Sequence, residues 1–165
     1  PLSGVRDATY TFENDLVPDP HSALVRLVEA GVRPLLAVSK EIRPVRRVLV
    51  AYSGSMESAK AMKRFVEMRL WADARLRIVT FEQDSDKARR LVDDAAEYCR
   101  AHGFEVDSAI VQESAKDHLL PYADEWGADL MVVGNSARNL LVRQIFGETA
   151  LHAIQHSSRP LFLSQ

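Results

Sequence analysis

The run Leu130-Met131-Val132-Val133-Gly134 is the most apolar stretch of the chain, and it decides the class of fold. A short, continuous apolar run that ends in glycine is typical of a strand buried on both faces of a parallel sheet. Gly127, just ahead of the run, is a typical residue at a helix end. A loop bounded by Gly134 and Gly147 follows the run. The stretch therefore predicts a buried strand that connects two helices.

The same unit recurs along the rest of the chain. Short apolar runs with the character of strands alternate with segments whose apolar residues recur every three to four positions, as they do in helices. The strands are predicted at 48–52, 76–81, 105–111, 130–133 and 161–163, and the helices at 59–71, 88–99, 119–126 and 150–154. Strict alternation predicts an α/β fold, with a five-stranded parallel doubly wound sheet and helices on both faces.

Polar residues stand where these helices should begin. Ser53 or Ser55 is placed to cap the first helix, and Asp84-Ser85-Asp86 supplies capping oxygens for the second. Ser114, followed three residues later by Asp117, resembles a capping box with Asp in place of Glu. We therefore expect each of these helices to start with a capping hydrogen bond from a side chain.

Composition narrows the class of protein. The chain has 165 residues, 47% of them hydrophobic, and a net charge of −2, so neither nucleic acid nor a membrane is an expected partner. The single cysteine, Cys99, falls on the apolar face of a predicted helix and should be buried. No signal segment or membrane-length apolar run is present, which favours a cytoplasmic protein. The first residue is Pro1, which suggests a chain processed or cut from something longer.

An internal repeat links the two ends of the chain. Residues 22–28 lead to Arg33-Pro34-Leu35-Leu36-Ala37-Val38-Ser39, and residues 149–155 lead to Arg159-Pro160-Leu161-Phe162-Leu163-Ser164. Both read as a helix, then Arg-Pro, then a strand, and residues 4–17 share the spacing of 134–147. We infer that residues 1–45 are the degenerate carboxyl-terminal tail of a preceding copy of the domain, plus a linker, and that residues 46–165 are a complete domain.

The loop from Gly134 to Gly147 is the one stretch that resembles a binding site. Glycines after a strand and before a helix let the backbone approach a phosphate, and the helix amino end adds partial positive charge. The segment from Ala128 through Gly147 to Leu161 resembles the carboxyl half of the universal stress protein family. That family has Gly, two residues, Gly, nine residues, then Gly with Ser or Thr. Residues 48–58 resemble its first strand and turn.

The resemblance implies a flavodoxin-like fold of the adenine nucleotide alpha hydrolase type, and a nucleotide site in those members that bind ATP. Carried over residue by residue, the phosphate loop corresponds to Gly134, Ala137, Arg138, Gly147, Glu148 and Thr149. The first turn corresponds to Ser53, Gly54 and Ser55, and the strand bordering adenine to Thr80 and Phe81. No cofactor is expected as a resident group, although ATP is compatible with the loop.

Three positions depart from the family pattern. Ser53 replaces an aspartate that typically meets the nucleoside, and Ala137 replaces the second glycine of the loop. Glu148 replaces the Ser or Thr whose hydroxyl would bond a phosphate. A carboxylate there repels a phosphate, unless Arg138 or Arg143 offsets its charge or Thr149 takes the place of the hydroxyl. The loop is therefore stronger evidence for the fold than for a working ATP site.

The leading hypothesis is a non-enzymatic stress-response regulatory module that acts by pairing with another universal-stress-type domain. The resemblance implies pairing through the last strand, either in a homodimer or inside one chain. The candidate contact residues are Pro34, Leu35, Leu36, Ala37 and Val38 together with Pro160, Leu161, Phe162 and Leu163. An unpaired edge strand needs a cover, which agrees with this reading.

Other functions stay open. The first alternative is an ATP- or AMP-binding switch that uses the Gly134–Gly147 loop. The second is a nucleotide hydrolase, for which no nucleophile or general base is evident, and the third is the regulatory tail of a transporter. His152 and His156 have a spacing that suits a metal, but no Cys, Asp or Glu clearly completes the set, so no metal is expected.

Overall fold

A computed structural model describes residues 34–38, 44–134, 157 and 159–164 of the chain. Strands and helices alternate through most of this part, as the sequence predicts. In chain order the elements are β1 (Leu35–Ala37), β2 (Arg47–Ala51), α2 (Met56–Met68), β3 (Arg75–Phe81), α3 (Ser85–Ala101), β4 (Val106–Val111), α4 (Ala115–Trp126), β5 (Leu130–Gly134) and β6 (Leu161–Ser164). The predicted helix at 150–154 lies outside the described residues.

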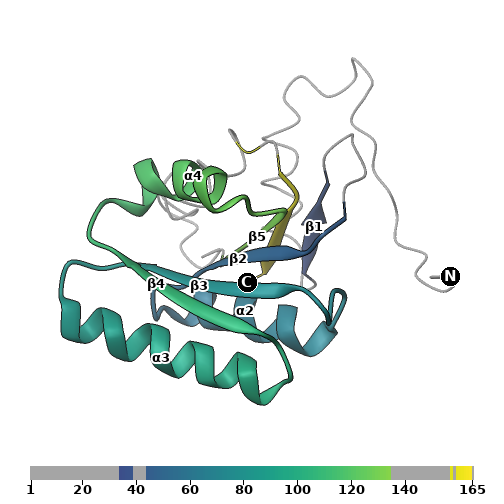
Figure 1. Cartoon of the computed structure of the whole chain (residues 1–165), viewed down its shortest axis with the longest axis horizontal. Helices are drawn as coiled ribbons and strands as arrows, with labels where there is room; N and C mark the ends of the chain where they lie inside the picture. The colour runs from purple at the N-terminus through teal and green to yellow at the C-terminus, as the bar shows by residue number, and fades with distance from the viewer. Residues whose placement is uncertain (1–33, 39–43, 135–156, 158, 165) are drawn as a thin grey trace, which may run out of the picture.

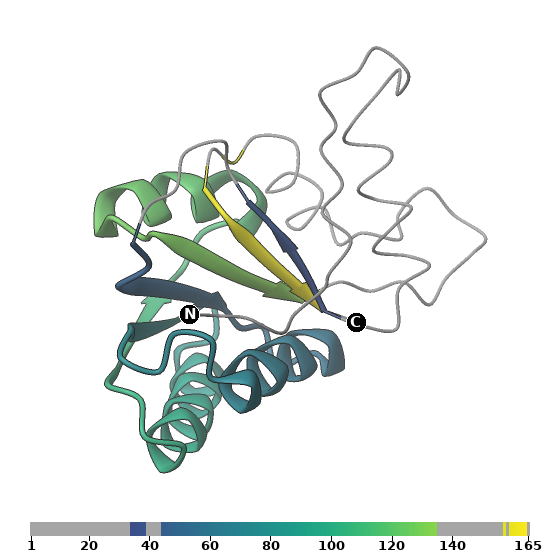
Figure 2. The same ribbon diagram turned by 90° about the vertical axis from the view of Figure 1, so that its right-hand side faces the viewer.

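The strands form one sheet in the order β1-β6-β5-β2-β3-β4. The strands from β6 to β4 pair in parallel, which confirms the predicted parallel doubly wound sheet. The described residues contain six strands and not five, because β1 adds to the outer edge of β6 in the antiparallel sense. Figure 2 shows β1, in blue, beside β6, in yellow. The internal repeat predicts this additional strand, although not as one of the five strands of the complete domain.

The chain reverses its direction of travel across the sheet between β2 and β5. From β2 it winds outward through β3 to β4, and it then returns to β5 on the other side of β2 and continues to β6. The carboxyl ends of β2 and β5 therefore form the topological switch point, where α/β sheets of this type hold their ligands. The Ser53-Gly54-Ser55 turn and Gly134 both lie at these carboxyl ends.

Each face of the sheet has its own apolar core. The helices α2 and α3 cover one face and α4 lies on the other (Figure 1). Alternate residues of the strands point to the two faces, so Val48 and Val50 pack with α2 and α3 while Leu49 packs with α4. Cys99 of α3 is fully buried, as predicted. Burial raises the pKa of its thiol to about 12, so the thiol stays protonated.

Two of the three described helices begin with the side-chain cap that the sequence predicts. The Ser55 hydroxyl accepts the Ser58 N–H, and the Asp84 carboxylate accepts the N–H groups of Asp86 and Lys87. The capping box predicted at Ser114 and Asp117 is wrong, because the Ser114 side chain makes no capping hydrogen bond. Ser114 contributes only its backbone carbonyl, which accepts the N–H groups of Asp117 and His118.

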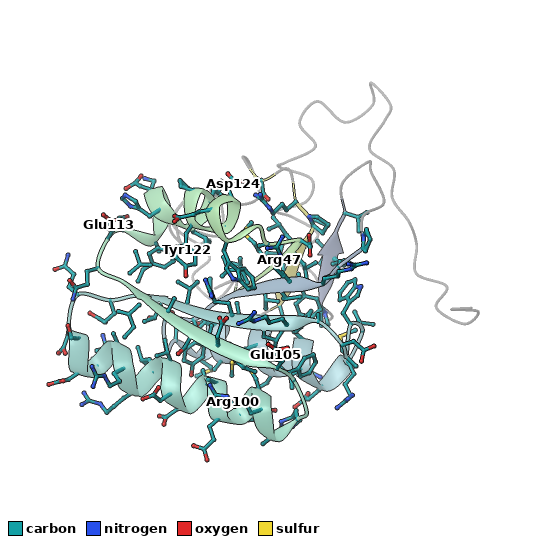
Figure 3. The ribbon with its side chains drawn as sticks, viewed as in Figure 1. Arg47, Arg100, Glu105, Glu113, Tyr122 and Asp124 are labelled. Carbon is teal, nitrogen blue, oxygen red and sulfur yellow. The ribbon has the colours of Figure 1, made fainter. Side chains whose placement is uncertain are left out.

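β4 is the edge strand of the sheet on the side opposite β1. Parallel pairing leaves the carbonyl of Val106, the first residue of β4, directed away from β3. Arg100 of α3 donates a hydrogen bond from Nη2 to this carbonyl oxygen, at 3.2 Å. In Figure 3, Arg100 lies on α3 close to Glu105, which immediately precedes β4. A charged side chain therefore occupies the start of this edge strand.

Candidate functional site

Gly134 closes the switch point by direct contact with the first turn of α2. A β-carbon built on Gly134 would lie 2.5 Å from both the carbonyl carbon of Glu57 and the backbone nitrogen of Ser58. Backbone atoms cannot move aside as the end of a flexible side chain can. The end of β5 thus comes against the start of α2 only because residue 134 has no side chain. The glycine that the resemblance assigned to a phosphate loop has a packing role in this structure.

At Gly54 the backbone conformation, in addition to close packing, requires a glycine. Its φ of +76° is in the left-handed region, which side-chain-bearing residues rarely adopt. A β-carbon at Gly54 would also lie 2.4 Å from Cδ2 of Leu91 on α3. Leu91 therefore packs over the turn that follows β2. Nothing in the sequence predicts this contact, since Leu91 belongs only to the apolar spacing of a helix.

The three serines at the start of α2 bond to one another. The Ser58 hydroxyl donates to the Ser55 carbonyl oxygen at 2.9 Å and lies 3.2–3.3 Å from the hydroxyls of Ser55 and Ser53. It also lies 3.3 Å from the Ser53 backbone nitrogen. Ser58 is buried, whereas Ser53 and Ser55 are exposed. Ser58 was missed as a site residue, although it stands at capping distance after Ser55.

Thr80 and Phe81 of β3 point to opposite faces of the sheet. Thr80 shares the face of Leu76 and Ile78, which pack against α2 and α3, and Phe81 packs in the core beside α4. Thr80 is 1% exposed, and its hydroxyl has no hydrogen-bond partner in the described part of the structure. Leaving a buried hydroxyl unpaired costs about 1–3 kcal/mol. Of the two residues, only Thr80 has a side-chain polar atom that could bond a ligand.

The amino end of α3 is capped by a negatively charged side chain, that of Asp84. Hydrogen bonds from the backbone, chiefly from Lys87, lower the pKa of the Asp84 carboxyl, and a side-chain hydrogen bond from Lys87 lowers the pKa of Glu82. Both carboxylates are therefore charged at neutral pH. The amino end of α3 has its own carboxylate, which would repel a phosphate there. The amino end of α2 has a neutral cap, Ser55.

The remaining residues of the predicted nucleotide site lie outside the described residues. They are Ala137, Arg138, Gly147, Glu148 and Thr149. The described part of the predicted site therefore consists of the turn after β2, the end of β3 and Gly134. In this part the structure brings the turn and Gly134 together around the first turn of α2.

The second candidate site is the edge of the sheet at β6. The register pairs Leu35 with Leu163, Leu36 with Phe162 and Ala37 with Leu161. The two predicted pairing segments therefore meet inside one chain, which is one of the two arrangements that the sequence left open. Pro34 and Pro160 precede the paired residues, and Val38 lies beyond the ladder and is 69% exposed.

Arg159 fixes the entry into β6. Its Nε donates to the carbonyl of Ala128 at 2.6 Å, and its guanidinium forms an ion pair with Asp124 at the end of α4. The Ser157 hydroxyl accepts the backbone N–H of Arg159 at 3.0 Å. Figure 3 shows Asp124 on α4. Arg159 of the Arg-Pro pair thus has a structural role, which the sequence did not predict.

No metal site and no membrane segment is found in the part of the chain that the structure describes. There, no three side chains of His, Cys, Asp or Glu gather closely enough to hold an ion. No helix among these residues has the length and apolarity to cross a membrane.

Comparisons with known proteins identify the fold and the family. Residues 44–164 match the model of the universal stress protein family. The curated universal stress protein Slr1230 of Synechocystis is 22% identical over 138 residues, which cover 82% of this chain and 48% of that protein. The chain thus spans about half the length of the curated relative it matches.

Solved structures agree with this match. A universal stress protein of Archaeoglobus fulgidus has a TM-score of 0.68 at 23% identity, covering 84% of this chain and 52% of that one. A family protein of Arabidopsis thaliana, solved with AMP bound, has a TM-score of 0.56 at 17% identity, covering 72% of this chain and 90% of that one. These likenesses support the fold, and the family model covers most of the sequence. The chain belongs to the universal stress protein family.

Proposed function

We propose that this chain is a non-enzymatic regulatory module that acts by pairing with another universal-stress-type domain through the β6 edge of its sheet. The supporting observation is the antiparallel ladder between β1 and β6. In this proposal residues 1–45 are the tail of a preceding domain, and residues 46–165 form the complete one. A relative about twice as long as the matched region is compatible with a tandem arrangement.

The chemistry at the switch point favours binding over catalysis. Hydrolysis needs a nucleophile that an adjacent base can deprotonate. In the described part of the structure, the hydroxyls of Ser53, Ser55 and Ser58 contact one another and the backbone, and none contacts a histidine or a carboxylate. Among the described residues these hydroxyls therefore act as a cap and a turn brace, which suits a module without enzymatic activity.

A disulfide trap tests the pairing. Residues directly opposite in an antiparallel ladder have Cα atoms about 4.5–5.5 Å apart, which a disulfide can bridge. In the full chain, Ala37→Cys/Leu161→Cys should therefore oxidise to an intramolecular disulfide, visible as a mass loss of about two protons and faster migration without reductant. If both thiols remain free under oxidising conditions while the chain is folded, the pairing and the proposed function fail.

A matched control shifts the trap out of register. Ala37→Cys/Leu163→Cys moves one thiol by two residues along the same strand face, and it should oxidise slowly and incompletely. The native Cys99 does not interfere, because it is buried and its thiol pKa is raised to about 12. The difference between the two variants then reports the register of β1 on β6.

A nucleotide-binding switch is the second candidate. Its supporting observations are the unpaired Thr80 hydroxyl, the exposed Ser53 and Ser55 at the switch point, and the relative solved with AMP bound. A nucleoside hydroxyl or ring nitrogen could supply the missing partner of Thr80. The substituted Ser53 and the carboxylate of Glu148 argue for weak affinity.

Calorimetric titration separates the two candidates. The full chain is titrated with ATP, AMP and cyclic AMP, each with and without Mg²⁺, beside Thr80→Val. A switch that uses Thr80 should release heat with at least one nucleotide in the wild-type chain and bind it more weakly in the variant. Absence of heat and of any thermal shift at millimolar nucleotide would remove this candidate and leave the pairing proposal untouched.

A further inference from the structure

The ladder between β1 and β6 has a symmetry that the sequence repeat explains. Aligned on their Arg-Pro pairs, Leu35, Leu36 and Ala37 correspond to Leu161, Phe162 and Leu163. In the structure Leu36 lies directly opposite Phe162, its own counterpart. Leu35 lies opposite Leu163, and Ala37 lies opposite Leu161. The two strands are therefore related to each other as two copies of one strand would be in an antiparallel pair.

This relation is the pattern of an isologous contact. In such a contact one surface meets a copy of itself around a two-fold axis, so residue i touches j and residue j touches i. Here the axis passes between Leu36 and Phe162. Any antiparallel pairing of two equivalent strands has this symmetry, and the observed register sets the position of the axis.

β6 has contacts with the rest of the domain besides those with β1. Phe162 packs edge-on against Phe65 of α2, with ring centroids 5.4 Å apart. On its inner side β6 pairs with β5, and Arg159 ties its start to the carbonyl of Ala128. The outer edge of β6 is consequently a fixed template with backbone groups that need partners.

β1 is held much less firmly. Its ladder has three residue pairs, Leu36 is 38% exposed, and Leu35 and Ala37 are only half-buried. The segment between Ala37 and Arg47 can span about 30 Å when extended. The three strand spacings that separate β1 from β2 amount to about 14 Å. The connection is thus long enough for β1 to leave β6 without disturbing the rest of the sheet.

We propose that β1 is a built-in competitor that occupies the edge which a second copy of this chain would otherwise use. This inference rests on the proposed pairing through β6. When β1 leaves, β6 pairs with the β6 of the second copy around the same two-fold axis. Phe162 then lies opposite the partner's Phe162, and Leu161 opposite the partner's Leu163. Self-association of the chain is therefore controlled by whether β1 is docked.

Displacing β1 by charge tests the proposal in the full chain. Leu35→Asp/Ala37→Asp places two carboxylates on the half-buried face of β1 and leaves β6 intact. Val38→Asp is the matched control, because Val38 lies beyond the ladder and is 69% exposed. In sedimentation equilibrium at micromolar concentration, the wild type and the control should have the mass of one chain. The double variant should have twice that mass.

The register of the new pair has its own test. In the double-variant background, chains carrying Leu161→Cys are mixed with chains carrying Leu163→Cys. The mixture should form disulfide-linked dimers at least several times faster than either chain alone, because only unlike positions lie opposite each other. An excess of a synthetic peptide with the sequence of residues 33–39 should return the double variant to the mass of one chain.

A folded double variant that keeps the mass of one chain overturns the proposal. So does a dimer that forms equally in Val38→Asp, or one in which the mixed cysteine chains cross-link no faster than the separate ones. If the double variant does not fold by circular dichroism, the single Leu35→Asn substitution gives the same comparison. A positive Ala37→Cys/Leu161→Cys trap together with a monomeric double variant would reject this inference alone. A negative trap would reject the proposed function as well.

Discussion

Arg77 holds Asp107 with two parallel hydrogen bonds across β3 and β4. The Nε–Oδ1 distance is 2.5 Å and the Nη2–Oδ2 distance is 3.0 Å. On its other side the guanidinium lies over the Trp126 ring, 4.8 Å from the centroid, and Nη1 donates to the hydroxyl of Tyr122 at 3.4 Å. Tyr122 lies between α4 and the sheet (Figure 3). One arginine thus connects the edge strand to the helix above it.

This pair makes stability depend on pH. Burial alone would raise the pKa of Asp107, but the hydrogen bonds and charges of Arg77 and Arg75 outweigh it, so the pKa is lowered. A lowered pKa stabilises the fold above the ordinary value near 4 and loses this effect as pH falls through the folded value. Asp107→Asn should therefore lose about 1–2 kcal/mol at pH 7 and progressively less towards pH 3. Urea unfolding at both pH values measures the difference.

Glu105→Gln is the control for that experiment. Its ion pair with Arg75 is 3.4 Å long, and its side chain is 75% exposed. Exposed pairs contribute little, so the change should be close to zero at both pH values. Equal losses in both variants would contradict the assignment of the pH dependence to the Arg77–Asp107 pair.

Gly134→Ala tests the packing of β5 against α2. The new methyl carbon would lie 2.5 Å from backbone atoms of Glu57 and Ser58, which is well inside van der Waals contact, so the backbone must move. Crowding of this kind costs about 1–3 kcal/mol. Gly103→Asn is the comparison, since the nearest atoms there are 3.7 Å away and Asn tolerates a positive φ. A loss at Gly134 no larger than at Gly103 would contradict the crowding.

Ser55→Ala and Ser114→Ala form a matched pair. Both serines are exposed N-cap residues, but only the Ser55 hydroxyl accepts a hydrogen bond from its helix. Loss of a working cap costs about 1 kcal/mol. Ser55→Ala should therefore lower the free energy of unfolding by about that amount, and Ser114→Ala by a few tenths at most. Denaturant unfolding of both variants decides, and equal effects would refute the difference in capping.

Thr80→Val removes the one buried hydroxyl that lacks a partner in the described residues. Valine has nearly the same shape and no polar atom to leave unpaired. The ligand-free chain should therefore unfold at an equal or higher denaturant concentration after this change, by up to about 1 kcal/mol of stability. A clear loss of stability would mean that the hydroxyl has a partner in solution, such as a buried water molecule.

Cys99 should be unreactive in the folded chain. It is fully buried, and its thiol pKa is raised to about 12. The thiolate that attacks a disulfide reagent is therefore nearly absent at pH 8. We expect no labelling by an aromatic disulfide in buffer and one equivalent in denaturant. Rapid labelling of the native chain would show that α3 opens locally at low cost.

Much of the fold follows from local patterns in the sequence. The apolar runs at residues 48–52, 76–81 and 130–133 predict strands that the structure confirms within one residue. Strand and helix periods are properties of neighbouring residues, which explains this agreement. The first predicted helix ends at Met68, ahead of the expected Trp71, because Arg69 takes a left-handed conformation with φ of 49°.

The site was harder to predict because its contacts join distant parts of the chain. The positions of Gly54 and Gly134 marked the switch point, but the close packing of Gly134 against the backbone of α2 could not be predicted from them. The contact of Leu91 with Gly54 has no sequence signature. Ser114 and Asp117 have the spacing of a capping box, yet the hydroxyl makes no such bond. The spacing makes that bond possible but does not ensure it.

Arg100 of α3, which bonds the first residue of β4, limits the addition of further strands at this edge of the sheet. If the β6 edge of one molecule added to the β4 edge of the next, the contact would be heterologous and would extend into a filament. Arg100 already bonds the carbonyl of Val106, so an incoming strand would first have to displace a charged side chain. In the proposed association through β6, two molecules use the same edge, so neither has a β6 edge left for a third molecule. Such a pair is closed, and Arg100 opposes extension into a fibre at the β4 edge.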